Sequence, residues 1–307
     1  MKISAVVPCL NEEFNIPPLY DKITNALSVY DDYEIIFIDD GSKDGTLSVI
    51  KELAAKDAKV KYISFTRNFG MEAAFRYGYL YASYEWCIHY DADLQWPPED
   101  TWKLTKKAEE GFDAVFGVRT NRKDRLYRSI GSKGQSFVAR KMFNIEIPVG
   151  ASSFRILKTS IVKKVLEYPV KTPYFLAALP LVTRNYATVE VGHNNRLHGK
   201  TRFSLSKLCN ESFRLFFGFS NKMLNFSAIA SIISLVAFIP LFIYVLTHPG
   251  YGNGSLIIFL CFLSLIHLIS KAISDQHLKY AVLNPPYHET AFVRQSNIEA
   301  CVEERVI

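Results

Sequence analysis

Two carboxylates separated by one residue follow a short apolar segment, and their spacing suits the binding of a cation. Trp86 to Tyr90 is apolar enough to form a buried strand, and Asp91 and Asp93 come directly after it. Positions i and i+2 of a strand project to the same side, so we expect the two carboxylates to face one small volume. Such a pair is unfavourable unless a cation lies between the charges or one carboxylate is protonated. Carboxylate oxygens suit Mg²⁺ or Mn²⁺, and Mg²⁺ is commonly shared between one or two carboxylates and the phosphates of a substrate.

An ordinary solvated turn is the alternative, because Asp ahead of Pro-Pro is common in loops. Two further segments favour a ligand site. Residues 36–38 form a second apolar run that ends in Asp39 and Asp40, and residues 3–8 form a third, which is followed by residues 9–13 (Cys-Leu-Asn-Glu-Glu). In an open α/β sheet, ligands bind at the carboxyl ends of the strands. We therefore expect the three acidic loops to form one ligand site.

Four motifs in this order resemble the family 2 glycosyltransferases, which have the GT-A fold. They are residues 7–13 (Val-Pro-Cys-Leu-Asn-Glu-Glu), 39–46 (Asp-Asp-Gly-Ser-Lys-Asp-Gly-Thr), 67–70 (Arg-Asn-Phe-Gly) and 91–99 (Asp-Ala-Asp-Leu-Gln-Trp-Pro-Pro-Glu). Within that family the chain is similar to the polyprenyl-phosphate branch, which includes dolichol-phosphate mannose synthase and the bacterial undecaprenyl-phosphate glucosyltransferases. The resemblance extends from about residue 3 to about residue 275. It implies an inverting enzyme that transfers a sugar from a UDP- or GDP-linked donor to polyprenyl phosphate.

The resemblance also implies roles for residues in these loops. Asp93 would be the main ligand of Mg²⁺ or Mn²⁺, with Asp91 and Gln95 assisting, and the two carboxylates would be the catalytic pair. The cation would neutralise the diphosphate as the glycosidic bond breaks. Asp40 would accept hydrogen bonds from the base or ribose of the nucleotide. The other donor-binding residues that it implies are Pro8, Leu10, Asn11, Glu13, Arg67, Arg196 and Arg202.

The last two of these residues belong to the segment 196–203 (Arg-Leu-His-Gly-Lys-Thr-Arg-Phe). It is similar to the family pattern Arg-x-x-Gly-x-Ser-Lys, with Thr201 in place of serine and Arg202 in place of lysine, and would close over the donor diphosphate. A nucleotide-binding P-loop is excluded, because that motif needs a glycine five residues before Gly199 and Asn194 stands there.

A basic stretch follows the Asp-x-Asp loop. Residues 119–141 contain eight Arg or Lys and one acid. Such a run can be a solvated face, but arginine and lysine also bind phosphate through charge-assisted hydrogen bonds. By resemblance, Arg119, Arg128 and Ser132 would hold the lipid phosphate. Nucleic acid is the weaker candidate, because the net charge is only +6 and the neighbouring membrane segments account for basic residues.

Residues 152–155 (Ser-Ser-Phe-Arg) align with a segment in which many relatives carry an acid before the Phe-Arg pair. Here Ser153 occupies that position. An alcohol acceptor needs a general base, because a hydroxyl is a poor nucleophile at neutral pH. A phosphate monoester is already largely ionised, with a second pKa near 6, and can attack without one. The missing acid is therefore compatible with a phosphate acceptor.

Strand and helix patterns alternate in the first 120 residues. Strands are expected near 3–8, 34–39, 60–65, 86–90 and 113–118, with helical patterns between them, including 70–82 and 98–110. A helix is also expected to start at Asp44, and a further strand near 187–195. This alternation predicts an α/β fold with a mostly parallel sheet.

Two apolar segments near the end of the sequence predict membrane spans. Met223 to Leu246 carries no charge and is long enough to cross a bilayer core of about 30 Å. Ser255 to Ser270 is shorter but extends to residue 273 if Lys271 snorkels. Buried core helices are the alternative. Basic residues flank the pair and are absent from the connecting turn, so the catalytic domain and both termini are predicted to face the cytoplasm.

We therefore predict a cytoplasmic GT-A domain (1–202), an interfacial amphipathic helix (203–222), a transmembrane hairpin (223–273) and a cytoplasmic tail (274–307). Phenylalanines and cations in the second segment suit the headgroup layer, although an ordinary amphipathic helix has the same pattern. Five cysteines at scattered spacings form no metal motif and predict reduced thiols. The tail could pack against a neighbouring copy in a homo-oligomer. Two other functions stay open: extension of a glycan on a lipid diphosphate, and a non-catalytic membrane partner of a flippase.

Overall fold

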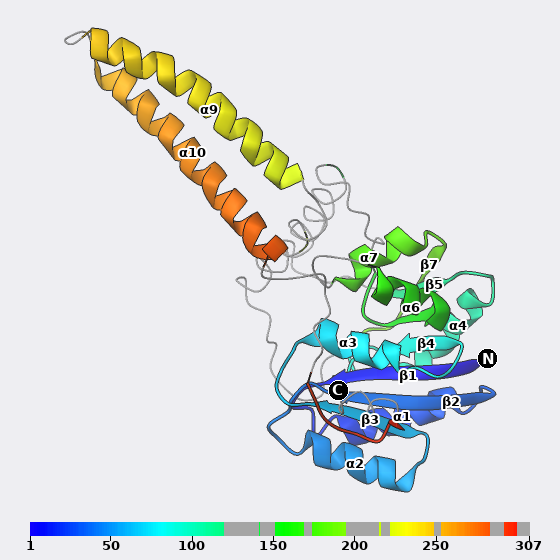
Figure 1. Ribbon diagram of the computed structural model, residues 1–307. Coiled ribbons are helices and arrows are strands. Elements are labelled where there is room, and N and C mark those ends of the chain that lie inside the picture. The colour runs from blue at the N-terminus through cyan, green and yellow to red at the C-terminus, as the bar shows by residue number, and fades with distance from the viewer. Residues whose placement is uncertain are drawn as a thin grey trace.

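The computed structural model describes residues 1–119, 151–168, 174–194, 222–248, 253–282 and 292–299, together with Lys141 and Leu215. These residues form a sheet domain from which a long pair of helices projects (Figure 1). The predicted interfacial segment 203–221 lies outside the described residues, apart from Leu215.

The domain is built on one sheet of eight strands in the order β7-β5-β6-β4-β1-β2-β3-β8. Neighbouring strands are parallel except where β6 pairs with β4 and β5 and where β8 pairs with β3, so the predicted mostly parallel α/β sheet is confirmed. The strands are β1 Lys2–Cys9, β2 Asp32–Asp39, β3 Val60–Phe65, β4 Trp86–His89, β5 Ala114–Arg119, β6 Arg155–Lys158, β7 Tyr186–Val191 and β8 Val293–Ser296.

Helices cover both faces of this sheet and bury a separate apolar core on each. The helices are α1 Ile16–Leu27, α2 Thr46–Lys56, α3 Met71–Leu80, α4 Thr101–Ala108, α6 Thr159–Glu167 and α7 Phe175–Val182, with a 3-10 turn, η1, at Pro98–Asp100. One core contains apolar residues of α1, α2 and α4, and the other contains residues of α3, α6 and α7. Because the central strands are covered on both faces, they are continuous apolar runs in the sequence.

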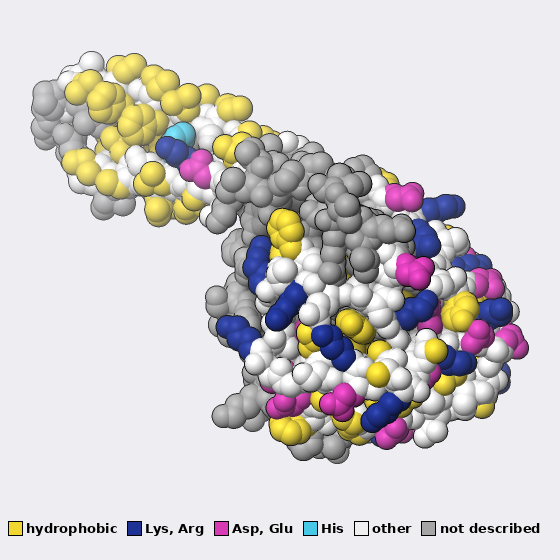
Figure 2. Space-filling view, turned by 60° about the horizontal axis from the view of Figure 1, so that its bottom comes forward, with side chains coloured by type: hydrophobic (Ala, Val, Ile, Leu, Met, Phe, Trp, Pro, Cys, Tyr) yellow, Lys and Arg dark blue, Asp and Glu magenta, His cyan; other side chains and the backbone are white. Residues whose placement is uncertain are grey.

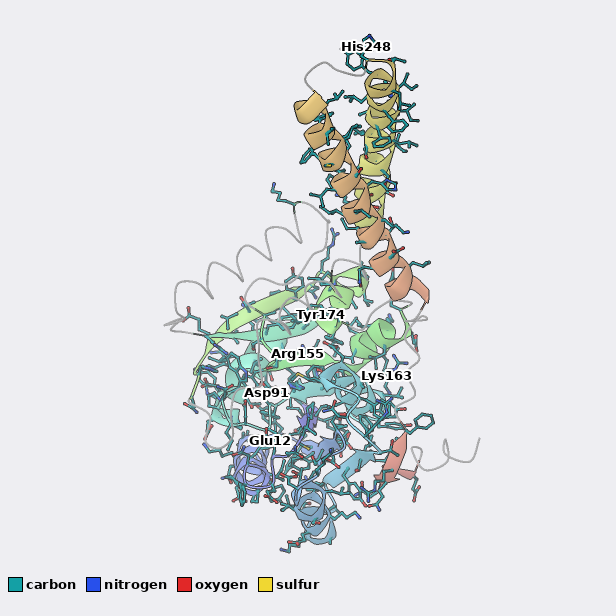
Figure 3. The ribbon with its side chains drawn as sticks, turned by 90° about the vertical axis from the view of Figure 1, so that its left-hand side faces the viewer. Glu12, Asp91, Arg155, Lys163, Tyr174 and His248 are labelled. Carbon is teal, nitrogen blue, oxygen red and sulfur yellow. The ribbon has the colours of Figure 1, made fainter. Side chains whose placement is uncertain are left out.

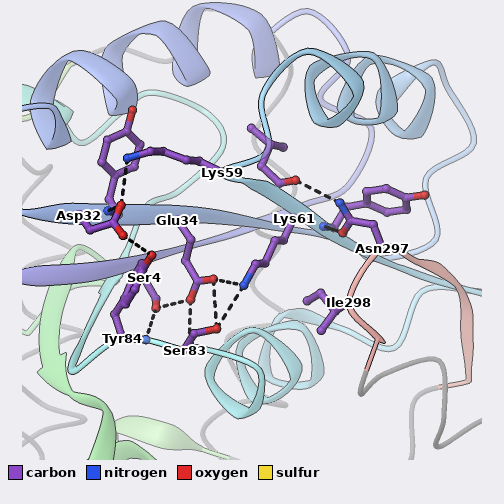
Figure 4. Close-up of polar contacts among 12 residues, drawn as sticks. Ser4, Asp32, Glu34, Lys59, Lys61, Ser83, Tyr84, Asn297 and Ile298 are labelled. Carbon is purple, nitrogen blue, oxygen red and sulfur yellow. Dashed lines mark hydrogen bonds and ion pairs between the residues drawn. The ribbon is translucent and has the colours of Figure 1, made fainter.

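Helix α3 lies unusually close to the sheet, and a glycine makes this possible. A Cβ atom at Gly78 would lie 2.3 Å from Cγ1 of Val6 and 2.8 Å from Cδ1 of Ile38. The end of α3 is held by a buried carboxylate, Glu34 of β2, which accepts hydrogen bonds from Ser4 Oγ at 2.5 Å and from Ser83 N at 2.7 Å (Figure 4). The C-terminal end of α3 is therefore held close to the sheet.

The two predicted membrane segments form the helical pair. Helix α9 is Lys222–Thr247 and α10 is Asn253–Val282, and each contains a charge-poor stretch long enough to cross a membrane. Only 11% of the residues in each stretch are buried within the structure. This low burial favours membrane spans over core helices. The hairpin surface is mainly hydrophobic, whereas charged side chains gather on the sheet domain (Figure 2).

Serine side chains hold the two helices together. Ser227 Oγ donates to the carbonyl oxygen of Ser270 at 3.0 Å, Ser231 and Ser270 share a hydrogen bond of 2.6 Å, and Ser234 Oγ donates to Leu263 O at 3.0 Å. Contacts of this kind, from small residues and interhelical hydrogen bonds, are those that join helices in lipid, where there is no hydrophobic force between them. The apolar side chains are left to face outward.

Candidate active site

A cavity of about 730 Å³ opens at the carboxyl ends of β1, β2, β4 and β5. This is where ligands bind in open α/β sheets. Seven of the residues predicted for the site line it: Pro8, Leu10, Asp40, Asp91, Asp93, Gln95 and Arg119. Further lining residues, not predicted for a site, include Cys9, Glu12, Asn68, Met71, Trp96, Val118 and Ser152. Ser153, which occupies the position where an acid was expected from the resemblance, also lines the cavity. The three acidic loops therefore converge as expected.

The structure places two other predicted donor-binding residues in contacts between loops. Asn11 Oδ1 accepts a hydrogen bond from Lys43 N at 2.8 Å, and Glu13 Oε2 accepts one from Gly45 N at 2.7 Å. Asn11 has a φ of 53°, a left-handed conformation that asparagine tolerates better than most residues. These contacts brace the loop after β1 against the loop after β2, and a role in donor binding stays a prediction for both residues.

Asp40 holds the Arg-Asn-Phe-Gly loop against the cavity. Its carboxylate accepts hydrogen bonds from Phe69 N at 2.7 Å and from Gly70 N at 3.0 Å. Burial raises the pKa of Asp40 to about 6, although these two N–H groups act in the opposite direction. The guanidinium of Arg67 lies 4.0 Å from the centre of the Phe69 ring. Asp40 thus lines the cavity and also holds the neighbouring loop 67–70 through hydrogen bonds to its backbone.

Asp91 is held from two sides. His89 Nε2 lies 3.0 Å from Asp91 Oδ1, and Ser153 Oγ donates to Oδ2. Burial lowers the pKa of His89, so the imidazole is neutral and donates through Nε2, since a carboxylate can only accept. Burial would raise the pKa of Asp91, but the interaction with His89, the hydrogen bond from Ser153 and the charge of Arg155 together hold that pKa below its ordinary value.

The reason that Asp91 and Asp93 meet differs from the one inferred from the sequence. Strand β4 ends at His89, so neither carboxylate is on the strand and the strand-alternation argument was wrong. They lie in a turn in which Leu94 has a φ of 60° and Gln95 N donates to Asp93 Oδ1 at 3.1 Å. The turn brings both carboxylates to the cavity.

Arg155, which was not predicted for the site, is near enough to Asp91 for its charge to act on that carboxylate. It is 2% exposed and pairs with His89 across β6 and β4. Its Nε donates to Tyr79 OH at 3.0 Å, and the centres of the Phe75 and Phe175 rings lie 4.8 and 4.5 Å from the guanidinium. Figure 3 shows Asp91 between Glu12 and Arg155. The Phe-Arg pair after Ser153 was the only sequence signal for this buried cation.

The basic side of the cavity is described in part. The Arg119 guanidinium lies 5.4 Å from the centre of the Trp96 ring, and that ring stacks on Phe154 at 6.3 Å. Trp96 therefore forms a rigid platform beneath Arg119. The other predicted phosphate-binding and diphosphate-binding residues, Arg128, Ser132, Arg196 and Arg202, lie outside the described residues.

The oxygen donors at the cavity fit a small divalent cation that is completed by a substrate. The described residues contain no cluster of three or more His, Cys, Asp or Glu side chains able to enclose a metal. Asp91, Asp93 and Gln95 nevertheless line one cavity and offer two carboxylates and an amide. Mg²⁺ and Mn²⁺ accept such hard donors, and Mg²⁺ typically takes its remaining ligands from water and substrate phosphates.

Comparisons with known proteins agree with this geometry. A family model described as Glycosyl transferase family 2 matches residues 4–166. The chain is 30% identical over 284 residues to the uncharacterized glycosyltransferase YkcC of Bacillus subtilis, an alignment that covers 90% of this chain and 88% of YkcC. It is 32% identical over 210 residues to the undecaprenyl-phosphate 4-deoxy-4-formamido-L-arabinose transferase of Aeromonas hydrophila, covering 68% of this chain and 64% of that enzyme.

A solved structure shares the fold of the sheet domain. Glucosyl-3-phosphoglycerate synthase of Mycobacterium tuberculosis, crystallised with Mn²⁺, UDP and phosphoglyceric acid, superposes with a TM-score of 0.50 at 20% identity. The superposition covers 70% of this chain and 76% of the synthase. At that identity the likeness concerns the arrangement of the sheet and its helices.

Proposed function

The chain belongs to glycosyl transferase family 2, and from that premise we propose that it transfers a sugar from a nucleotide-diphosphate donor to the phosphate of a polyprenyl lipid. The transfer inverts the anomeric centre and depends on Mg²⁺ or Mn²⁺. One observation carries the choice of acceptor: Ser153 donates its hydrogen bond to Asp91, at the position where the resemblance leads us to expect an acid. An acceptor that is already ionised needs no general base there.

The donor occupies the part of the cavity formed by the loops after β1, β2 and β4. Asp93, Asp91 and Gln95 hold the cation, which neutralises the departing nucleoside diphosphate. Asp40, Pro8 and Leu10 line the part nearer β1 and β2, where they contact the nucleoside. Asn11, Glu13 and Arg67 support these contacts, and Arg196 and Arg202 close over the diphosphate.

The acceptor phosphate binds at the basic side of the same cavity. Arg119 lines the cavity over Trp96, and Arg128 and Ser132 complete the phosphate site. The relative from Aeromonas hydrophila is named as a transferase that acts on undecaprenyl phosphate, which supports a lipid phosphate as the acceptor. The hairpin of α9 and α10 lies in the inner membrane, and the basic residues that flank it keep the sheet domain and both termini in the cytoplasm.

A donor screen tests the proposal. Purified full-length protein is incubated with UDP- and GDP-linked sugars and undecaprenyl phosphate, and nucleotide release is measured with Mg²⁺, with Mn²⁺ and with EDTA. We expect release that requires both the lipid phosphate and the divalent cation. Undecaprenol, which has the same chain but an alcohol head, is the matched control and should accept no sugar.

Two outcomes would overturn the proposal. Transfer to a lipid-diphosphate-linked glycan but not to lipid phosphate would identify an enzyme that extends glycans. An α-linked product from an α-linked donor, determined by NMR of the isolated lipid, would contradict inversion, because a single in-line displacement gives the β anomer.

A further inference from the structure

The segment that follows the membrane hairpin returns to the sheet domain. Helix α10 ends at Val282, and residues 292–299 lie along the edge of the sheet, where β8 pairs antiparallel with β3 (Figure 1). The register joins Ile63 with Ser296 and Phe65 with Val293. No such strand was expected, since we predicted only a polar cytoplasmic tail. Part of that tail thus belongs to the sheet of its own chain.

Asn297 fastens the far end of this strand. Its Oδ1 accepts a hydrogen bond from Tyr62 N at 2.7 Å, and its Nδ2 donates to Val60 O at 3.1 Å (Figure 4). Ser296 Oγ donates to Tyr62 O at 2.9 Å. These contacts lie toward the start of β3, on the side away from the cavity. They hold the strand without touching the site.

Phe292 fastens the near end, where β3 runs into the loop 67–70. Thr66 N donates to the carbonyl oxygen of Phe292 at 2.9 Å. The Phe292 ring lies 6.5 Å from the Phe69 ring, which also packs edge-on against Phe65 at 5.7 Å. Phe69 is therefore held between its own strand and the returning tail.

Phe69 is also where the loop meets the cavity. The amides of Phe69 and Gly70 donate to Asp40, and Asn68 and Gly70 line the cavity. Gly70 has a φ of 95°, a conformation that glycine adopts at little cost. Because glycine is free to adopt other conformations as well, the geometry of the loop depends on its contacts. A continuous series of contacts thus runs from the tail to Asp40.

We propose that Phe292 is a positioning residue of this site: it holds the Phe69 ring, and through it keeps the loop 67–70 in the geometry in which its amides reach Asp40. The strand links the membrane hairpin to the donor side of the cavity. This inference rests on the proposed function only for what the cavity binds, because the contact itself involves no substrate.

Hydrogen–deuterium exchange of the full-length protein tests the contact. We compare Phe292→Ala with Asn297→Ala, which weakens the other end of the same strand. Because Phe292 is 68% exposed, its truncation opens no cavity in the core. We expect the peptide that contains the Phe69 and Gly70 amides to exchange about five- to tenfold faster in Phe292→Ala, and about as in the wild type in Asn297→Ala. Phe292→Leu, which keeps an apolar contact, should restore most of the protection.

Unchanged exchange of this peptide in Phe292→Ala, or an equal increase in both alanine variants, would overturn the proposal. The exchange needs no donor, so this result is independent of whether the proposed transfer is correct. With an active donor, Phe292→Ala should also raise KM for the nucleotide sugar about three- to tenfold and leave kcat and KM for the lipid phosphate nearly unchanged. A fall in kcat alone would contradict a positioning role at the donor side.

Discussion

At the scale of single residues, the two carboxylates of the Asp-x-Asp loop differ in their surroundings. Both oxygens of Asp91 accept hydrogen bonds from the chain itself, from His89 and Ser153. Asp93 Oδ1 accepts a hydrogen bond from Gln95 N in its own turn. In the proposed site, Asp91 is a fixed negative charge, and Asp93 keeps its proposed role as the main ligand of the cation. Substitutions at the two positions should therefore act differently.

Asp93→Asn should lower kcat by a hundredfold or more, because it removes the charge of a ligand while it changes little volume. Loss of a residue that only hydrogen-bonds a metal ligand already lowers activity or metal affinity about 10–100-fold. The thermal midpoint should stay within a few degrees of the wild type. The measurement is sugar transfer at saturating Mn²⁺ together with a thermal scan. Near-normal turnover of this variant would show that Asp93 is not a ligand of the cation.

Ser153→Ala should weaken Mn²⁺ activation about tenfold, because Asp91 loses the donor to its Oδ2. Ser153→Thr keeps the hydroxyl and is the matched control, and it should retain most of the affinity. The apparent activation constant for Mn²⁺ is measured for both variants. Equal constants for alanine and wild type would show that His89 alone is sufficient to hold Asp91.

Asp40 should make stability depend on pH. Burial raises its pKa from 3.8 to about 6, so the folded state binds the proton more tightly than the unfolded state. The contribution of Asp40 to stability is then fully present below pH 4 and is lost as the pH rises to about 6, with a ceiling of about 3 kcal/mol. Thermal unfolding should show the wild type losing stability relative to Asp40→Asn across this window. A constant difference between the two proteins would contradict the raised pKa.

At the scale of helices and strands, the sequence was most informative where burial alone decides the structure. Strands β1 to β3 were predicted within two residues, because both of their faces are covered and their apolar runs are continuous. Strand β8 could not be found in this way: Val-Arg-Gln-Ser is short and polar, and it is a strand only because β3 offers an unpaired edge. Helix α2 begins at Thr46, two residues after the predicted start at Asp44.

For the cavity, too, the sequence predicted some features and missed others. The motifs identified the loops, and seven of the predicted residues line the cavity. The sequence could not predict which side chains face the cavity, because their orientation depends on contacts between loops. Asn11 and Glu13 brace the loop after β2, whereas their neighbour Glu12 lines the cavity. Arg155 was missed because burial of a cation among aromatic rings leaves no periodic signal.

Gly78→Ala should destabilise the sheet domain by about 1–3 kcal/mol, because its Cβ would lie 2.3 Å from Val6 Cγ1 and α3 would have to move. Gly254→Ala is the matched control, since a Cβ there meets no atom within 4 Å. Denaturation of the two variants and the wild type measures the difference. Equal stability of Gly78→Ala and wild type would show that α3 can shift away from the sheet without cost.

At the scale of the whole molecule, the hairpin and the sheet domain are joined at two places along the chain. One connection is the segment before Lys222, and the other leads from Val282 to β8. The sequence predicted the hairpin because a long apolar run without charges is typical of a membrane-spanning helix. It did not predict the second connection, because residues far apart in the chain form it and the strand is too short to have a pattern of its own.

Two truncations test whether the segment after Lys200 only anchors the protein or also contributes to the active site. A chain that ends at Lys200 loses Arg202, the hairpin and β8, whereas one that ends at Val282 keeps the first two and loses only the tail. We expect the shorter chain to transfer no sugar even to a short, soluble prenyl phosphate, since Arg202 is predicted to close over the diphosphate. The longer chain should keep transfer with a KM for the donor about three- to tenfold higher.

Arg202→Ala in the full-length protein is the control, and it should be severely impaired although the membrane anchor is intact. Transfer to the soluble acceptor is measured for all three proteins, with circular dichroism to verify folding. Loss of a charge-assisted contact to a phosphate costs about 1.5–3 kcal/mol, so a fall of ten- to a hundredfold in kcat/KM is expected for this single substitution. Full activity of both the Lys200 truncation and Arg202→Ala would mean that the hairpin is a tether and that residues 1–200 alone are a complete enzyme.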